Sequence, residues 1–140
     1  MLRGIPKIIS PELLKILMEM GHGDELCIGD GNFPAASNAQ ILVRADGHGV
    51  PELLEAILSL FPLDTFEAPV HIMDKVVNDG EPIPIWKTYE ELVRSHTDFS
   101  IIRLERFAFY DRAKKCYAIL ATSEPAPYAN IILKKGVIKD

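Results

Sequence analysis

Apolar residues along the chain follow two patterns, one typical of helices and one typical of buried strands. Spacings of three and four residues predict helices over 11–20, 51–61 and 85–96, and 107–115 reads as a short fourth helix. Short apolar runs predict strands at 26–28, 41–43, 70–73, 101–104, 117–122 and 128–133. Strands that alternate with helices favour an α/β fold: one domain over residues 1–140, three layers (helix, sheet, helix) and a mostly parallel central sheet.

Several boundaries of these elements carry their own signals. Ser10 is a good N-cap, Pro11 suits the first helical position, and Gly21 ends the helical run. Gly80 and two prolines predict a loop over 78–84. The last two strands are joined by a short turn at Pro125 and Pro127, so we expect them to pair antiparallel.

Composition narrows the class of protein. The 140 residues are 48% hydrophobic and 25% charged, as in an ordinary soluble globular protein. The formal net charge of −5 gives no electrostatic attraction for nucleic acid, and no apolar run reaches the roughly 20 residues of a membrane span. The first residues lack the apolar core of a signal peptide, and Cys27 and Cys116 form no metal or disulfide motif. We therefore expect a cytoplasmic protein with two buried, reduced cysteines.

Three polar clusters could carry chemistry. His22 lies between two glycines, with Asp24 and Glu25 close behind, and histidine is suited to proton transfer near neutral pH. Asp30 follows the first strand, where open α/β sheets place ligand-binding groups. Tyr128 and Asn130 lie two apart in the last predicted strand, so both would project from one face. Arg106, just before an aromatic segment, adds a clamp for a hydroxyl or an anion.

Each cluster also has a purely structural interpretation. His22 could be a surface or helix-capping residue, Asp30 a turn residue, and Tyr128 with Asn130 the solvent face of a strand. The other histidines show no metal-ligand spacing, so we expect no metal site. The sequence has no phosphate-binding loop, no GxSxG nucleophile and no CxxC motif, which disfavours common nucleotide, hydrolase and redox chemistry.

Taken together, the motifs resemble those of the D-ribose pyranase / L-fucose mutarotase family. The matching segments run in the family's order from end to end: Ser10–Leu14, Met20–Glu25, Asn32–Ala35, Arg44–Gly47, Pro62–Phe66, Arg106–Ala113 and Tyr128–Gly136. The segments around Asp64 and Arg106 look like the fucose branch, because the ribose branch typically has histidine in place of Arg106. The segment Gly29–Asn32 and the alanine between Tyr128 and Asn130 depart from the usual fucose pattern.

The resemblance implies a cofactor-free isomerase that interconverts the α and β anomers of a free pyranose, with L-fucose the first candidate. It assigns catalysis to His22, with Tyr110 and Tyr128 as further proton-transfer groups. It assigns sugar binding to Asp30, Arg106, Tyr128 and Asn130, with Asp64 and Met73 in the same pocket. It also implies a ring-shaped homo-oligomer, for example a decamer, with sites between neighbouring subunits.

The distance along the chain between His22 and Asp30 also bears on whether sites lie between subunits. His22 and Asp30 flank the first strand, and eight extended residues span about 26 Å, much more than a sugar ring. Either the chain curls at its glycines, or one pocket takes His22 and Asp30 from different subunits. Three other functions stay open: anomer or ring-form exchange on D-ribose, a non-catalytic monosaccharide-binding protein, and a structural module whose polar loops only make subunit contacts.

Overall fold

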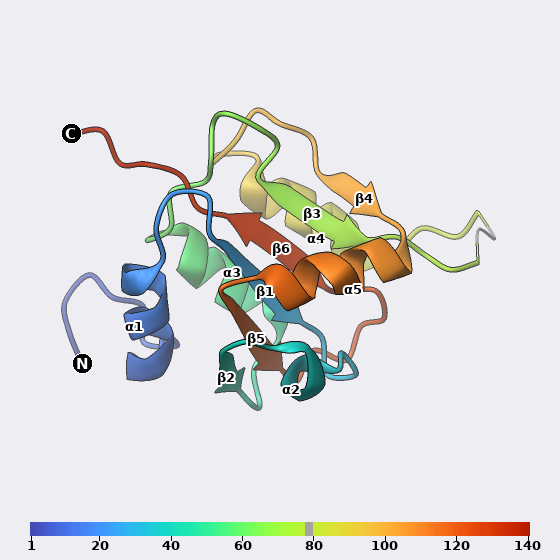
Figure 1. Cartoon of the computed structure of the whole chain (residues 1–140), viewed down its shortest axis with the longest axis horizontal. Helices are drawn as coiled ribbons and strands as arrows, with labels where there is room; N and C mark the ends of the chain where they lie inside the picture. Colours follow the sequence, from blue (N-terminus) through green and yellow to red (C-terminus); the bar gives the residue numbers. More distant parts are fainter. Residues whose placement is uncertain (78–79) are drawn as a thin grey trace.

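A single six-stranded sheet forms the centre of the molecule (Figure 1). The computed structural model describes residues 1–77 and 80–140. The helices are α1 (Pro11–Glu19), α2 (Ala35–Asn38), α3 (Val50–Leu58), α4 (Pro84–Val93) and α5 (Arg106–Lys115). The strands are β1 (Glu25–Gly29), β2 (Leu42–Ala45), β3 (Val70–Met73), β4 (Ile102–Leu104), β5 (Ala118–Thr122) and β6 (Ile131–Lys134).

The sheet is mixed, with five parallel strands and one that runs the other way. Its order is β2-β5-β1-β6-β3-β4, and β6 is antiparallel to both β1 and β3. The mostly parallel α/β fold is therefore confirmed. The predicted antiparallel pairing of the last two strands is wrong, because β1 lies between β5 and β6 and pairs with each of them.

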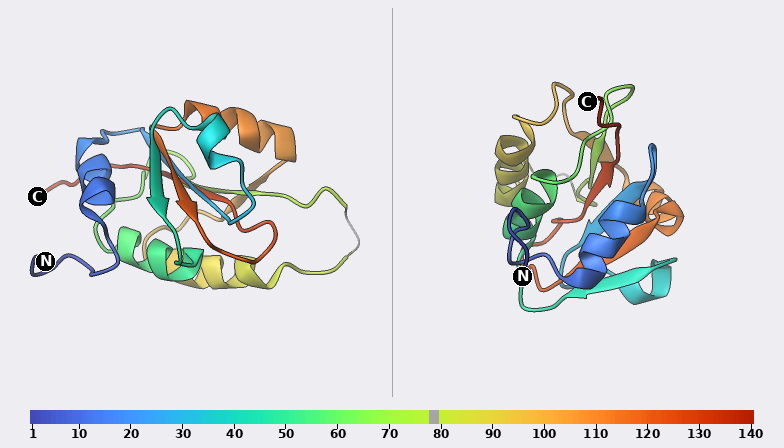
Figure 2. Two further views of the ribbon diagram at one scale, coloured as in Figure 1. Left: turned by 90° about the horizontal axis from the view of Figure 1, so that it is seen from below. Right: turned by 90° about the vertical axis from the view of Figure 1, so that its left-hand side faces the viewer.

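Both faces of the sheet are covered by helices, with α3 and α4 on one side and α2 and α5 on the other (Figure 2). The central strands divide their side chains between the two layers, as the period of two requires. In β1, Leu26 and Ile28 join the core beneath α3 and α4, whereas Cys27 joins the core beneath α5. Burial on both faces explains why the strands read as continuous apolar runs.

Several predicted boundaries move in the structure. The last strand begins at Ile131, so Tyr128 and Asn130 lie in the loop before it. The helix predicted to reach His96 ends at Val93. The predicted loop 78–84 includes residues 78–79, which lie outside the described part, and Pro84 already begins α4. The short helix α2 was not predicted.

Helix ends are capped by side chains close by and far away in sequence. Ser10 accepts a hydrogen bond from the Leu13 N–H at 3.1 Å, as its N-cap pattern predicts. Lys135 donates to the carbonyls of Leu17 and Met20 at the other end of α1.

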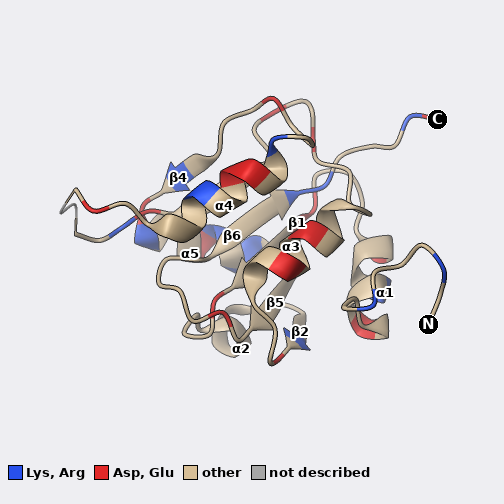
Figure 3. Cartoon of the chain, turned by 180° about the vertical axis from the view of Figure 1, so that it is seen from behind, with Lys and Arg blue, Asp and Glu red and all other residues tan. Residues whose placement is uncertain are grey.

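Acidic residues lie along the outer surfaces of α3 and α4 (Figure 3). Within the described residues, no helix has the length and apolar character needed to cross a membrane.

Candidate functional site

A cavity of about 340 Å³ opens where β1 and β3 end and α5 begins. Its lining comes from four segments of the chain: Asp30, Asn32, Phe33, Met73, Val76, Arg106, Tyr110, Pro127, Tyr128 and Asn130. The carboxyl ends of parallel strands are where α/β sheets bind ligands, and the volume lies at the small end of about 300–1,000 Å³ for such sites. Surface hollows of about 370 and 450 Å³ lie elsewhere, but neither contains a residue predicted for the site.

Asp30 is the buried carboxylate of this cavity. Its Oδ1 accepts from the Asn32 N–H at 3.0 Å, and its Oδ2 accepts from the Ala129 N–H at 3.3 Å. Its own N–H donates to Oδ1 of Asn130 at 2.8 Å. Burial raises the pKa of the Asp30 carboxyl above its ordinary value, although the backbone hydrogen bonds oppose that shift. Asp30 is therefore both a turn residue and a carboxylate facing the cavity.

Tyr128 and Asn130 both line the cavity, but not because they share one face of a strand. Tyr128 has a positive φ of 53°, an uncommon backbone conformation for a residue with a side chain. Its phenol oxygen accepts from the Val76 N–H at 3.3 Å. Asn130 contacts the Met73 sulfur through Nδ2 at 3.9 Å, which ties the end of β3 to the loop before β6. A loop conformation, and not strand alternation, brings the phenol and the amide together.

Arg106 and Tyr110 enter the cavity from the first turns of α5, where residues four apart share a side of the helix. Glu105 fixes this helix end by accepting from the N–H groups of Phe107 and Ala108 at 2.9 and 3.0 Å. The Arg106 guanidinium lies over the Phe107 ring at 4.6 Å. Nε of Arg106 is buried and has no hydrogen-bond partner among the described residues. A buried donor without a partner is costly, so this group is suited to an oxygen of a bound ligand.

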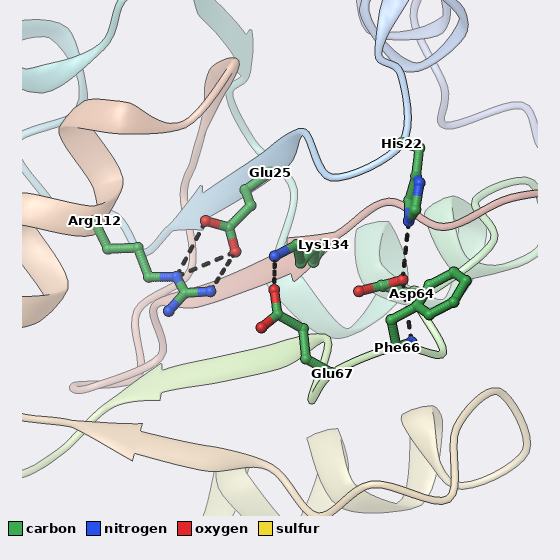
Figure 4. A network of polar contacts seen from close by, with 7 residues as sticks. All are labelled: His22, Glu25, Asp64, Phe66, Glu67, Arg112 and Lys134. Carbon is green, nitrogen blue, oxygen red and sulfur yellow. Dashed lines mark hydrogen bonds and ion pairs between the residues drawn. The ribbon is translucent and has the colours of Figure 1, made fainter.

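His22 lies elsewhere, in the turn that precedes β1. Its Nε2 is 3.2 Å from Oδ1 of Asp64, and the Phe66 ring lies 5.4 Å from the imidazole (Figure 4). The His22 side chain is 47% exposed, whereas that of Asp64 is 3% exposed. Burial opposes ionisation of Asp64, but hydrogen bonds from the Phe66 N–H and His22 outweigh it and lower the pKa of this carboxyl. The pair is an imidazole at the surface, oriented by a buried carboxylate.

Within one chain, the two groups of predicted site residues do not meet. Neither His22 nor Asp64 lines the cavity of Asp30 within one chain, whereas Met73 does. The strand between His22 and Asp30 is extended and does not curl. The extended β1 therefore keeps His22 and Asp30 apart within one chain.

The other acidic residues near His22 have structural partners. Asp24 accepts from the Gly21 N–H at 2.7 Å and closes the turn that presents His22. Glu25 receives two bonds from Nε of Arg112 at 3.1 Å and one from Nη2 at 2.7 Å (Figure 4). Among the described residues, no three His, Cys, Asp or Glu side chains are grouped so as to hold a metal ion.

Four lining residues are not among those predicted for the site: Asn32, Phe33, Val76 and Pro127. Phe33 stacks on Tyr110 with ring centroids 5.7 Å apart and supports it from the loop after β1. Its place in the segment Asn32–Ala35 was the only available hint. Val76 contributes a backbone N–H, which no side-chain pattern can reveal.

Comparisons with known proteins identify the family of this chain. The model of the RbsD / FucU transport protein family matches residues 3–138. The fucose mutarotase of Danio rerio is 51% identical over 98% of this chain and 94% of its own length, and that of Mus musculus is 52% identical over 98% and 95%. The crystal structure of the Streptococcus pneumoniae fucose mutarotase in complex with L-fucose has a TM-score of 0.94 and 50% identity, and the match covers 99% of this chain and 100% of that one. The chain belongs to the RbsD / FucU family.

Proposed function

We propose that this protein is an L-fucose mutarotase, which interconverts the α and β anomers of free L-fucose without a cofactor. One observation carries the proposal: Asp30, Arg106, Tyr128 and Asn130, named from the sequence as sugar-binding residues, line one cavity. Fucose mutarotases about half identical over nearly the whole chain, one of them holding L-fucose, support the choice of sugar.

The proposed chemistry is general acid–base catalysis. Opening the pyranose ring requires a proton off the anomeric hydroxyl and a proton onto the ring oxygen, and closing reverses both transfers. A positioned acid or base contributes about 10²- to 10⁴-fold, which is adequate for a reaction that already proceeds in water. Asp30, Arg106 and Asn130 hold sugar hydroxyls, with Met73 against the ring. His22 exchanges one proton, and Tyr128 or Tyr110 exchanges the other.

Tyr128 is suited to donate the proton. Its oxygen accepts the Val76 N–H and Tyr128 lines the cavity, so its own O–H hydrogen remains available to donate to a ligand there. His22 is suited to exchange a proton, because Oδ1 of the buried Asp64 lies 3.2 Å from its Nε2 and orients the imidazole. The two groups thus match the two transfers that ring opening needs.

The catalytic unit is a homo-oligomer in which His22 and Asp64 of one subunit complete the cavity of a neighbour. The spacing of the two groups within one chain supports this arrangement, since His22 is at the surface and outside the cavity. The exposed Phe66, 71% accessible beside His22, would be covered by such a contact. In a ring of subunits, for example a decamer, every subunit places its His22 surface against the cavity of a neighbour in the same way. The two buried free cysteines fit a reducing, cytoplasmic location.

Anomer-exchange NMR tests the function directly. Saturating the α-anomer signal of L-fucose should transfer saturation to the β-anomer within the enzyme's turnover time. His22→Ala and His22→Gln should lower the exchange rate about 100-fold or more, the usual contribution of a positioned base. His96→Gln is the matched control at an exposed histidine far from the cavity.

Four outcomes would reject all or part of this proposal. Exchange in the His22 variants within a few-fold of wild type would remove His22 from the mechanism. Faster exchange of D-ribose than of L-fucose would assign the sister activity, against which Arg106 argues. Thermal stabilisation by L-fucose without any anomer exchange would identify a sugar-binding protein. Absence of both stabilisation and exchange would indicate a structural module.

A further inference from the structure

Two aromatic side chains of α4, Trp86 and Tyr89, reach the loop that carries Tyr128. Both are buried, at 6% and 0% exposed. The indole Nε1 of Trp86 donates to the Tyr128 carbonyl at 2.8 Å, and the Tyr89 hydroxyl donates to the Ala129 carbonyl at 2.7 Å. Residues three apart lie on the same side of a helix, so one helix face holds two consecutive carbonyls.

This loop needs such support because Tyr128 adopts the left-handed backbone conformation, with φ at 53°. That conformation is unfavourable for a residue with a Cβ and persists only when its surroundings fix it. The Ala129 N–H adds a third tie, to Oδ2 of Asp30 at 3.3 Å. The Arg103 guanidinium covers the Trp86 ring at 4.6 Å and restrains the indole.

The conformation in turn sets where the phenol goes. Tyr128 lines the cavity, and its oxygen lies within hydrogen-bonding distance of the Val76 N–H. An extended residue at position 128 would direct the side chain along a different vector. Releasing either carbonyl would let the loop relax and move the phenol away from that position.

We propose that Trp86 and Tyr89 are positioning residues for catalysis, holding Tyr128 in the strained conformation that aims its phenol at the sugar. The inference rests on the proposed mutarotase function and on the role of Tyr128 in it. Neither residue touches the cavity, so both act through the backbone of the loop.

Trp86→Phe and Tyr89→Phe each remove one donor while an aromatic ring remains. For L-fucose anomer exchange, each should lower kcat about tenfold or more with KM changed much less, since misplacement by about 1 Å can cost a factor of about 100. In a Tyr128→Phe background the same substitutions should have little further effect on kcat, because the group that they position is already gone.

Tyr117→Phe is the matched control. It also removes a phenol hydrogen bond, to Glu19 at 2.9 Å, but far from the cavity, and should leave kcat at the wild-type value. Measuring kcat per folded protein separates an effect on the position of the Tyr128 phenol from an effect on stability. Tyr89→Phe is the smaller change, so it provides the test if Trp86→Phe folds poorly. Wild-type kcat in the variants, whatever their Tm, would overturn the inference alone. Absence of exchange in the wild-type protein would reject the proposed function and this inference with it.

Discussion

Two buried carboxyls show how residues of one type acquire different properties from their surroundings. Burial raises the pKa of Asp30. Burial is also the largest single influence at Asp64, but hydrogen bonds from the Phe66 N–H and His22 together outweigh it and lower the pKa of that carboxyl. Oδ1 of Asp64 lies 3.2 Å from Nε2 of His22, which suits a group that orients an imidazole. Asp30 is held in place by the N–H groups of Asn32 and Ala129, which suits a group that fixes sugar hydroxyls.

A different histidine, His71 on β3, controls stability in acid. Burial, together with the nearby Arg112 guanidinium, lowers the pKa of His71 to about 4, and its Nδ1 is buried without a partner among the described residues. The unfolded imidazole binds a proton at an ordinary pKa of about 6.5 and the folded one does not, so stability is lost as pH falls from about 6.5 to 4.

His71→Leu should therefore flatten the pH dependence of unfolding. Between pH 7 and 4.5 the wild-type protein should lose about 2 kcal/mol more of its unfolding free energy than the variant, as a shift of more than two pKa units implies. Urea unfolding at both pH values measures this difference. The control His96→Leu, at an exposed position, should keep the wild-type pH dependence of the unfolding free energy. If His71→Leu loses as much unfolding free energy between pH 7 and 4.5 as the wild-type protein, His71 is not the group responsible.

At the scale of elements, helix α3 depends on a residue far away in sequence. Gly49 at its N-cap has no side chain, and Glu124 takes over by accepting from the Val50 N–H at 3.0 Å through Oε1. Its Oε2 accepts from the Ala126 N–H at 3.0 Å. The carboxylate thus caps a helix and also shapes the loop that leads to Tyr128.

Glu124→Ala should lower the free energy of unfolding by about 2 kcal/mol, because it removes a cap and leaves buried N–H groups unpaired. Glu91→Ala, at an exposed position of α4, should change it by less than about 0.5 kcal/mol. Urea unfolding of both variants checks the difference. Equal effects would show that Glu124 is not the cap of this helix.

These elements also show what could be predicted from the sequence. Central strands such as β1 and β5 were found because burial on both faces makes them uninterrupted apolar runs. The four residues of α2 are too short to show a helical period. The partners of β6 were missed because a short connection suggests a hairpin, whereas this one crosses β1. The conformation of Tyr128 depends on side chains of α4, about 40 residues earlier in the chain, so no local pattern could reveal it.

At the scale of the whole molecule, the predicted site residues form two groups that do not meet within one chain. The cavity around Asp30 lies at the carboxyl end of β1, and His22 with Asp64 lies before its amino end. The length of this strand made the separation predictable from the sequence, even though the partners of each residue were not. A homo-oligomer that apposes the two ends of neighbouring subunits would form complete sites.

The most direct measurement is L-fucose anomer exchange by a mixed assembly of two inactive variants, His22→Ala and Asp30→Ala. If each site draws His22 from one subunit and Asp30 from another, as proposed, random mixing in equal amounts should restore about one quarter of the wild-type exchange rate. Each variant alone should stay near the uncatalysed rate. No recovery in mixed oligomers, with subunit exchange verified by mass spectrometry, would contradict a site shared between subunits.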